Sequence, residues 1–183
     1  PIRLCDFLEI IEDDKIKGGC CDLNMSGNVV SGDPEDNLCF KAFHLLHKRY
    51  KLPSVKLHLH KNIPIGAGMG GGSSNGAYTL MLLNELFSIG LTDRDLHSYC
   101  KMLGSDCSFF VENSLSFAVE KGDILHPLSL GLSDYFIVIV NPLIHINTAK
   151  MYNDLIPDES AKGGLKQAIS EPMLNWRETI ING

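Results

Sequence analysis

The chain has 183 residues, which suits one large domain or one domain with part of another. Its hydrophobic content of 44% and charged content of 21% are ordinary for a soluble globular protein. The net charge of −6, with no Lys/Arg cluster longer than His47–Arg49, argues against a nucleic-acid groove, which relies on a basic stripe. The longest uncharged apolar run, Tyr135–Val140, is too short to cross a bilayer, so no membrane partner is expected.

Four segments in the first third of the chain have the periodicity of strands or of a helix. Strands are expected at Ile2–Ile11, at Asp22–Ser31 (a strand, or a hairpin turning at 26–28) and at Val55–Lys61, and a helix at Leu38–Tyr50. Val55–Lys61 is the clearest strand because apolar and polar residues alternate in it. That alternation places His58 and His60 on the polar face of the strand.

The segment Ile63–Gly76 reads IPIGAGMGGGSSNG and precedes an apolar helix expected over Asn75–Ser88. Glycines allow bare backbone to approach a ligand, and the Ser-Ser-Asn run at 73–75 is suited to capping a helix start. The first turn of a helix attracts anions, so the segment predicts a phosphate cradle. The alternative is a flexible Gly/Ser linker, which the stiffening Pro64 and the apolar helix disfavour. The segment is neither a Walker A loop nor a clean dinucleotide fingerprint.

The second half of the chain predicts a helix, a polar insertion and further strands. The helix is expected over Thr92–Met102, the strands at Leu115–Glu120 and Phe136–Val140, and a short helix at Thr148–Leu155. The insertion at 103–108 contains Asp106, a carboxylate expected to be partly buried near the glycine loop and able to accept a proton from a hydroxyl. The alternative role for Asp106 is a helix cap.

Two further sets of residues leave alternatives open. Lys61, just before the loop, is suited either to steadying a phosphate or to an ordinary solvated strand end. The six cysteines have no zinc-ligand spacing and are read as reduced thiols, several of them buried.

The ordered motifs resemble those of the GHMP kinases. The loop Pro64-x-Gly-Ala-Gly-x-Gly-Gly-Gly-Ser-Ser-Asn75 resembles their phosphate-binding motif. The motifs at 32–38, 103–110, 122–125 and 147–152 follow in the order found in one branch, which phosphorylates 4-diphosphocytidyl-2-C-methyl-D-erythritol in non-mevalonate isoprenoid biosynthesis. The resemblance covers the chain from Ile2 to about Asn182. Another kinase of this family, acting on mevalonate-type acids, homoserine or a sugar, and a non-catalytic nucleotide-binding fragment remain the alternatives.

The resemblance implies roles for individual residues and for ATP and Mg²⁺. It makes Asp106 the base that deprotonates the substrate's 2-hydroxyl, Tyr152 a residue stacking on the cytosine ring with Thr148 close by, and Ser74 a candidate Mg²⁺ ligand. It assigns Asn37, Leu38 and Lys61 to the adenine pocket. The phosphate-binding residues that it implies are Pro64, Gly66, Ala67, Gly68, Gly70, Gly71, Gly72, Ser73, Ser74 and Asn75.

The implied fold is α+β, the GHMP kinase fold. It joins an N-terminal domain like ribosomal protein S5 domain 2, residues 1–127, to the start of a ferredoxin-like C-terminal domain, residues 128–183. The family's first strand, which carries a catalytic lysine, is expected ahead of Pro1, and a second glycine-rich loop beyond Gly183, so the chain is expected to be a fragment. We expect a monomer or homodimer in the cytoplasm, or in a plastid if a transit peptide precedes Pro1.

Overall fold

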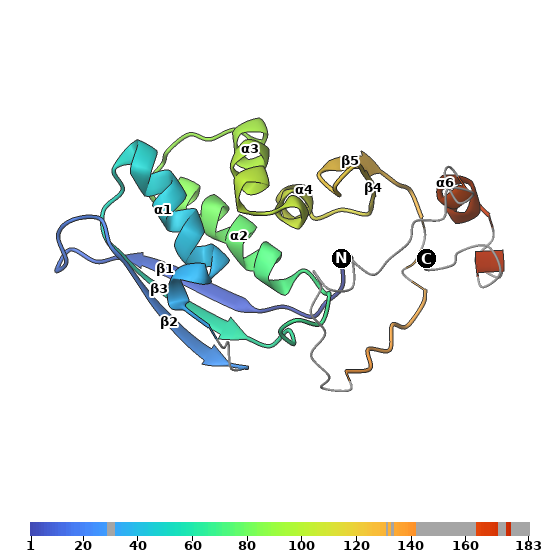
Figure 1. The fold of residues 1–183 in the computed structure, drawn as a ribbon, viewed down its shortest axis with the longest axis horizontal. Coiled ribbons are helices and arrows are strands. Elements are labelled where there is room, and N and C mark those ends of the chain that lie inside the picture. The colour runs from blue at the N-terminus through green and yellow to red at the C-terminus, as the bar shows by residue number, and fades with distance from the viewer. Residues whose placement is uncertain (29–31, 131, 133, 142–163, 172–174, 177–183) are drawn as a thin grey trace. The chain divides into compact units, whose positions relative to one another are not determined.

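The computed structural model describes residues 1–28, 32–130, 132, 134–141, 164–171 and 175–176 (Figure 1). Two compact units are present, Pro1–Pro142 and Leu143–Gly183. In the second unit the described secondary structure includes α6 (Gly164–Ile169), whose Ala168 is buried. The other elements that the structure describes belong to the first unit.

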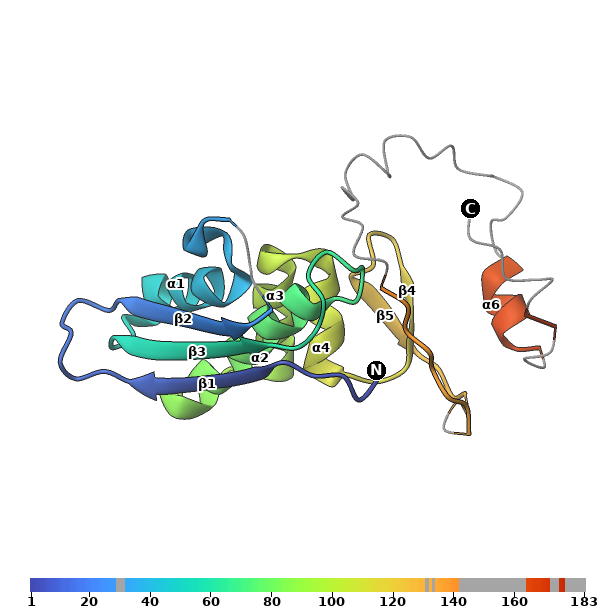
Figure 2. The same ribbon diagram turned by 90° about the horizontal axis from the view of Figure 1, so that it is seen from below.

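The first unit is built on a mixed sheet of three strands within the described residues. These are β1 (Phe7–Glu12), β2 (Cys21–Gly27) and β3 (Val55–Lys61), in the order β1-β3-β2 (Figure 2). Strand β3 pairs antiparallel with β1 and parallel with β2. Because parallel neighbours need a crossover connection, the chain passes from β2 to β3 through η1 (Pro34–Asp36) and α1 (Leu38–Tyr50).

Helices cover one face of this sheet (Figure 2). The glycine loop leads into α2 (Gly71–Leu86), which packs beside α1 (Figure 1). Helix α3 (Asp93–Leu103), η2 (Ser105–Ser108) and α4 (Phe109–Glu112) come next. The hairpin of β4 (Ser116–Val119) and β5 (Ile124–Pro127) completes the described elements of this unit.

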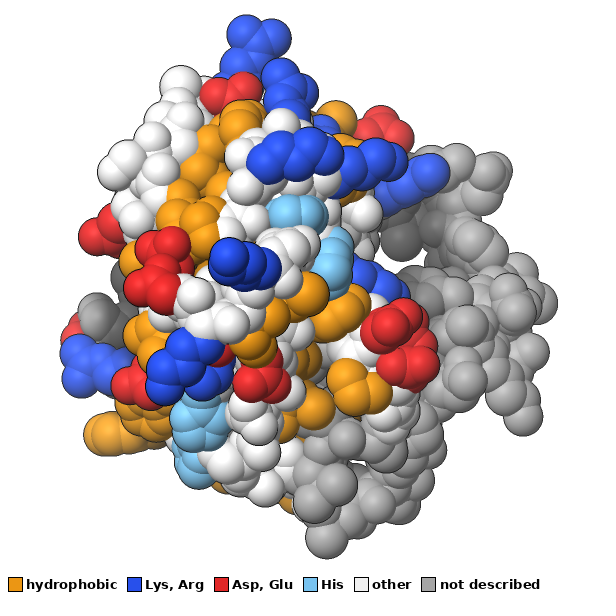
Figure 3. Space-filling view, turned by 90° about the vertical axis from the view of Figure 1, so that its left-hand side faces the viewer, with side chains coloured by type: hydrophobic (Ala, Val, Ile, Leu, Met, Phe, Trp, Pro, Cys, Tyr) orange, Lys and Arg blue, Asp and Glu red, His pale blue; other side chains and the backbone are white. Residues whose placement is uncertain are grey.

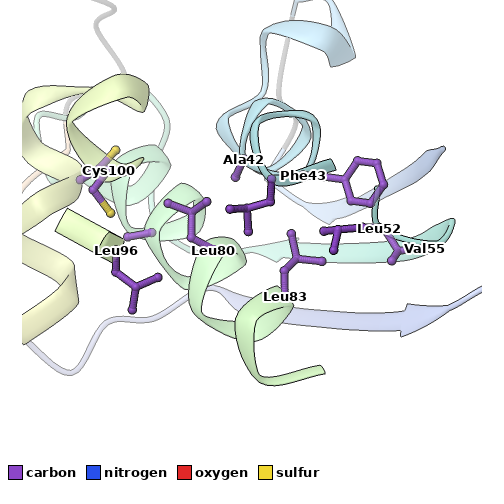
Figure 4. Close-up of a cluster of buried hydrophobic side chains, with 11 residues drawn as sticks. Ala42, Phe43, Leu52, Val55, Leu80, Leu83, Leu96 and Cys100 are labelled. Atoms are coloured by element: carbon purple, nitrogen blue, oxygen red, sulfur yellow. The ribbon is translucent and has the colours of Figure 1, made fainter. Parts of the chain in front are cut away.

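The core lies between the sheet and the helices. Figure 4 shows side chains from α1, α2, α3 and the start of β3 that meet there. Burying each large aliphatic or aromatic side chain contributes roughly 1.5–3 kcal/mol, so this layer supplies most of the favourable free energy of folding. The buried members labelled in the figure are Ala42, Phe43, Leu52, Val55, Leu80, Leu83, Leu96 and Cys100.

Several sequence-based expectations are confirmed at the level of single elements. Helix α1 and strand β3 have the expected bounds, and His58 is exposed on the polar face of β3. Helix α3 begins with the expected cap, since Thr92 and Asp95 form a capping box. The six cysteines are free thiols, and Cys39, Cys100 and Cys107 are buried.

Of the two alternatives for Asp22–Ser31, the strand is confirmed, because β2 runs along β3 through Gly27 without a hairpin turn; residues 29–31 lie outside the described residues. Two expectations are wrong, each for a physical reason. Helix α2 begins at Gly71, four residues earlier than expected, because the glycines adopt helical geometry where the chain packs on Ile63. The apolar run Phe136–Val140 is not a strand, and no described residue pairs with it; Phe136 is fully exposed. The helix expected over Thr148–Leu155 lies outside the described residues.

The surface seen in Figure 3 is of mixed charge. Lys and Arg side chains lie mainly toward the top of this face, and acidic, histidine and apolar side chains are interspersed below them. Among the described residues, no helix has both the length and the apolar character needed to cross a membrane.

Candidate active site

The glycine loop has an alternating backbone that turns its N–H groups outward. Gly66, Gly68 and Gly70 have φ values of 69°, 68° and 67°, while Ala67 and Met69 between them are not in the positive-φ region. Alternation of right- and left-handed residues directs successive N–H groups into a concavity that binds anions. Side chains rarely adopt the left-handed conformation, so glycine at these alternate positions is required by the shape of the loop.

The loop ends in an uncapped helix start. Gly70 is the N-cap of α2 and makes no side-chain cap hydrogen bond, and the first bond of the helix runs from the Ser74 N–H to the Gly70 carbonyl at 2.8 Å. The expected capping by Ser73, Ser74 and Asn75 is therefore wrong, since all three lie inside the helix. An N-terminus without a side-chain cap keeps its N–H groups and the positive end of its dipole available to an anion.

The end of β3 lies directly beneath this helix start. A Cβ added to Gly71 would lie 3.0 Å from Ile63 Cγ2 and 3.3 Å from Lys61 Nζ. Lys61 is only 5% exposed, so it is not the solvated strand end that the sequence allowed. Its ammonium pairs with the Asp6 carboxylate, which is 2% exposed, and donates to Asn75 Oδ1 at 2.9 Å. The loop thus begins on a buried ion pair.

Asp6 is a site residue that the sequence reasoning missed. Burial alone would raise the pKa of this carboxyl, but hydrogen bonds from Lys61, then from the Ile63 and Asn62 N–H groups and from Asn75, outweigh burial and hold the pKa below its usual value. A lone Asp ahead of a strand carries no motif, so no signal in the sequence alone distinguishes it.

A cavity of about 350 Å³ brings the loop together with the start of α1. Its wall includes the expected adenine-pocket residues Asn37, Leu38 and Lys61. Helix α1 comes this close because Gly76 has no side chain: a Cβ there would lie 3.0 Å from Leu38 Cβ. The expected phosphate-site residues that line the cavity are Pro64, Gly66, Ala67, Gly68, Gly70, Gly71, Gly72, Ser73 and Asn75, and Ile65 and Met69 of the loop line it as well.

Ser74 is the one expected phosphate-site residue that does not line this cavity; it lines a second cavity, as Asn75 also does. That second cavity, of about 440 Å³, also contains Tyr78, Phe109 and Phe110. Because Ser73 and Ser74 line different cavities, the two residues are not equivalent, although both were expected to bind phosphate. The expected substrate residues Thr148 and Tyr152 lie outside the described residues.

Asp106 lies in η2, which packs on the first turn of α2. The neighbouring Cys107 links the two elements through a hydrogen bond with the Ser73 side chain. Burial raises the pKa of the Cys107 thiol; the hydrogen bond with Ser73 opposes this rise, and the charge of Asp106 adds to it. Asp106 itself is exposed, so the expectation of partial burial is wrong. Exposure follows from the short 3-10 turn, which directs Cys107 inward and leaves the carboxylate free to meet a ligand.

Three further contacts lie around η2. A Cβ added to Gly70 would lie 2.9 Å from Phe110 Cζ, so the aromatic ring packs against the loop. On the other side, an ion pair of 3.0 Å between Lys101 and Asp123 ties the β4–β5 turn to α3. Gly122 in that turn approaches Asp106, with 3.7 Å between a Cβ added there and Asp106 Oδ1. Asp106 is therefore bordered by both the helix start and the hairpin turn.

The described residues contain no group of three His, Cys, Asp or Glu side chains arranged to hold a metal ion. Mg²⁺ at a phosphate site is usually held by one or two side-chain oxygens, with water and phosphate supplying the rest. The hydroxyl of Ser74 and the carboxylate of Asp106 are oxygen donors of the kind that Mg²⁺ prefers.

Comparison with known proteins places this geometry in a family. The family model described as the GHMP kinases N terminal domain matches residues 37–113, a range that contains both the glycine loop and Asp106. A curated relative from Bacteroides fragilis, named 4-diphosphocytidyl-2-C-methyl-D-erythritol kinase, is 41% identical over 187 aligned positions, covering all of this chain. The chain belongs to the GHMP kinase family. Its α+β fold, expected from the sequence, is that of the GHMP kinases.

Other relatives of this GHMP kinase chain carry the same name. Proteins from Bacteroides thetaiotaomicron and Azobacteroides pseudotrichonymphae, both named 4-diphosphocytidyl-2-C-methyl-D-erythritol kinase, are 40% and 39% identical to it. In each case all of this chain is covered, and it spans 66% of the relative's length.

Solved structures give the same picture of the fold. A crystal structure of 4-(cytidine 5'-diphospho)-2C-methyl-D-erythritol kinase superposes with a TM-score of 0.55 at 28% identity, covering 68% of this chain and 42% of that one. Homoserine kinase from Cytophaga hutchinsonii superposes with a TM-score of 0.57 over 90% of this chain and 56% of that one. The superposition supports a shared fold, but at 15% identity it carries no argument about the substrate.

Proposed function

We propose that the protein to which this chain belongs is an ATP-dependent kinase that phosphorylates the 2-hydroxyl of 4-diphosphocytidyl-2-C-methyl-D-erythritol. The observation that carries the proposal is the single cavity that joins the glycine loop to Asn37 and Leu38, with Asp106 anchored beside the same helix start. The names of the relatives support the choice of substrate over other alcohols.

In this proposal the backbone holds the phosphates of ATP. The N–H groups of the loop and of the first turn of α2 bind the phosphate oxygens, and the ends of η1 and α1 at Asn37 and Leu38 border the adenine. Such donors are already oriented before ATP binds, so they neutralise the charge that develops in the transition state without reorganisation.

Asp106 is proposed to accept the proton of the substrate hydroxyl. As that O–H bond breaks, the oxygen attacks the γ-phosphorus, the bond from this phosphorus to the bridging oxygen of ADP breaks, and ADP leaves. Bound Mg²⁺, for which we propose Ser74 as a ligand, would neutralise phosphate charge during the transfer. Thr148 and Tyr152, which lie outside the described residues, remain proposed contacts to the substrate. Monomeric or homodimeric assembly and a cytoplasmic location also stay proposals.

The test is a coupled assay of ADP release by the full-length protein. The cytidyl substrate is compared with mevalonate, homoserine and galactose, and Asp106→Asn serves as the inactive control. Turnover with the cytidyl substrate alone is expected. Turnover with only one of the other alcohols would refute the substrate assignment, and an Asp106→Asn variant with unchanged kcat would refute the role of the carboxylate.

A further inference from the structure

One carboxylate, that of Asp6, holds both ends of the glycine loop. Ahead of the loop, Asp6 Oδ1 accepts hydrogen bonds from the backbone N–H groups of Asn62 and Ile63, each 2.8 Å long. Beyond the loop, Asp6 Oδ2 accepts a hydrogen bond of 3.0 Å from the Asn75 side-chain amide. The residues between these contacts are the ones that line the proposed phosphate site.

Lys61 completes this arrangement. Its ammonium donates to Asp6 Oδ2 and to Asn75 Oδ1, so the three side chains form a closed set. Each is largely buried, with Asp6 and Lys61 at 2% and 5% side-chain exposure and Asn75 at 6%. Buried polar side chains are tolerated only when their hydrogen-bonding groups are paired, and these three side chains pair with one another.

The position of the set suggests a purpose beyond stability. A Cβ added to Gly71, the first residue of α2, would lie 3.3 Å from Lys61 Nζ, and the Asp6 bonds end at the residue just before Pro64. The loop itself is exposed at Ile65, Gly66, Ala67 and Gly68. Its shape therefore depends on how its two ends are held.

We propose that Asp6 is a positioning residue for nucleotide binding, acting with Lys61 and Asn75 to hold the loop N–H groups in the geometry that receives phosphate. The inference rests on the proposed function, because it concerns the same site. Donors fixed in advance lose less freedom when the ligand binds, so loosening either end of the loop weakens binding.

The experiment uses the full-length protein and two variants. Asp6→Asn removes the carboxylate charge but leaves the Lys61 ammonium buried without a counter-charge, which endangers folding. The double variant Asp6→Asn/Lys61→Met removes both charges and keeps the test valid if the single variant fails to fold. Asp13→Asn is the matched control, since Asp13 is also buried and paired, with Lys56 at 3.3 Å, but contacts the opposite end of β3.

Two measurements separate the effect of Asp6 on the ends of the loop from its effect on nucleotide binding. Without nucleotide, amide hydrogen exchange at Asn62, Ile63 and 74–76 is expected to accelerate at least about tenfold in the Asp6 variants, while exchange at 42–46 in the core of α1 changes less. The Kd for ADP and the KM for ATP are expected to rise on the order of tenfold, with a smaller change in kcat, because a displaced binding group costs affinity first. Asp13→Asn should lower Tm and leave the Kd for ADP within about twofold.

The outcomes are distinguishable. Wild-type exchange rates at the loop ends in the double variant would refute the inference that Asp6 holds the loop, whatever the protein binds. A wild-type Kd for ADP in a folded Asp6 variant would overturn its role in nucleotide binding. Failure of the wild-type protein to bind ADP, with faster loop exchange in the variants, would refute the proposed function and restrict the role of Asp6 to holding the loop.

Discussion

Two adjacent glycines in the first turn of α2 are expected to change the free energy of unfolding in opposite directions when each is replaced by alanine. Neither Gly71 nor Gly72 has a positive φ, so alanine fits the backbone at both, and restricting the unfolded chain stabilises by about 0.4–1 kcal/mol. At Gly72 no atom lies within 4 Å of an added Cβ, so the gain is retained. At Gly71 the new methyl meets Ile63 at 3.0 Å and Lys61 at 3.3 Å, both buried.

The magnitude follows from these contacts. Overpacking a tight site costs about 1–3 kcal/mol, so Gly71→Ala should lower the free energy of unfolding while Gly72→Ala raises it, with a difference of about 2 kcal/mol between the two. Both variants should bind ATP more weakly, because Gly71 and Gly72 both line the proposed phosphate cavity. Gly72→Ala would then be more stable and less active.

Urea unfolding of the two variants, with unchanged m-values, gives the difference in stability directly. Titration with ADP by calorimetry gives the affinity. If Gly71→Ala and Gly72→Ala had the same urea midpoint, the close packing of Gly71 on Ile63 and Lys61 would be refuted. If Gly72→Ala bound ADP like the wild type, the first turn of α2 would not be the phosphate site.

Three more outcomes are expected. Asp106→Asn should lower kcat by about 10²–10⁴-fold if the carboxylate is the base, with ADP affinity and Tm unchanged because Asp106 is exposed. The pKa of Asp6 is lowered in the folded state, so its contribution to stability is complete above the unfolded pKa of about 3.9 and is lost as pH falls through the lower folded pKa. The free energy of unfolding should therefore fall less between pH 6 and pH 2.5 in Asp6→Asn than in the wild type. Equal falls in the two proteins would contradict this. Iodoacetamide at pH 8 should alkylate exposed thiols first and reach the buried thiols, whose pKa values burial raises, only after denaturation, as mass spectrometry can show. The exposed thiols are Cys5 and Cys20, and the buried ones are Cys39, Cys100 and Cys107.

The sequence predicted elements whose pattern is continuous and whose ends are marked. Strand β3 alternates throughout, and α1 has Asn37, whose side chain accepts from the Cys39 N–H at 2.9 Å, as its N-cap. The start of α2 was misplaced because glycine has low helix propensity, which packing against Ile63 overrides. Phe136–Val140 was misread because β-branched residues favour strands only where a partner strand exists.

The residues of the candidate site also differed in how well the sequence predicted them. The glycine loop was singled out because its glycines leave a local pattern, whereas Asn37 and Leu38 were assigned only through the family resemblance; the structure places them with the loop around one cavity. Asp6 was not found because its meaning depends on donors 55 to 69 residues further along the chain. The exposure of Asp106 depends on a turn of four residues, η2, and no periodicity describes so short an element.

The long reach of Asp6 also affects the order in which the protein folds. Helices α1 and α2 can pair through contacts that are close in sequence, but the carboxylate reaches Asn62 and Asn75 only after β1 has docked on β3. Contacts at such separation are slow to form because the intervening chain must first be ordered. We therefore expect the loop to be among the last parts to reach its final geometry. A nucleotide that binds it stabilises the completed fold over partly folded forms, and its binding reports that folding is finished.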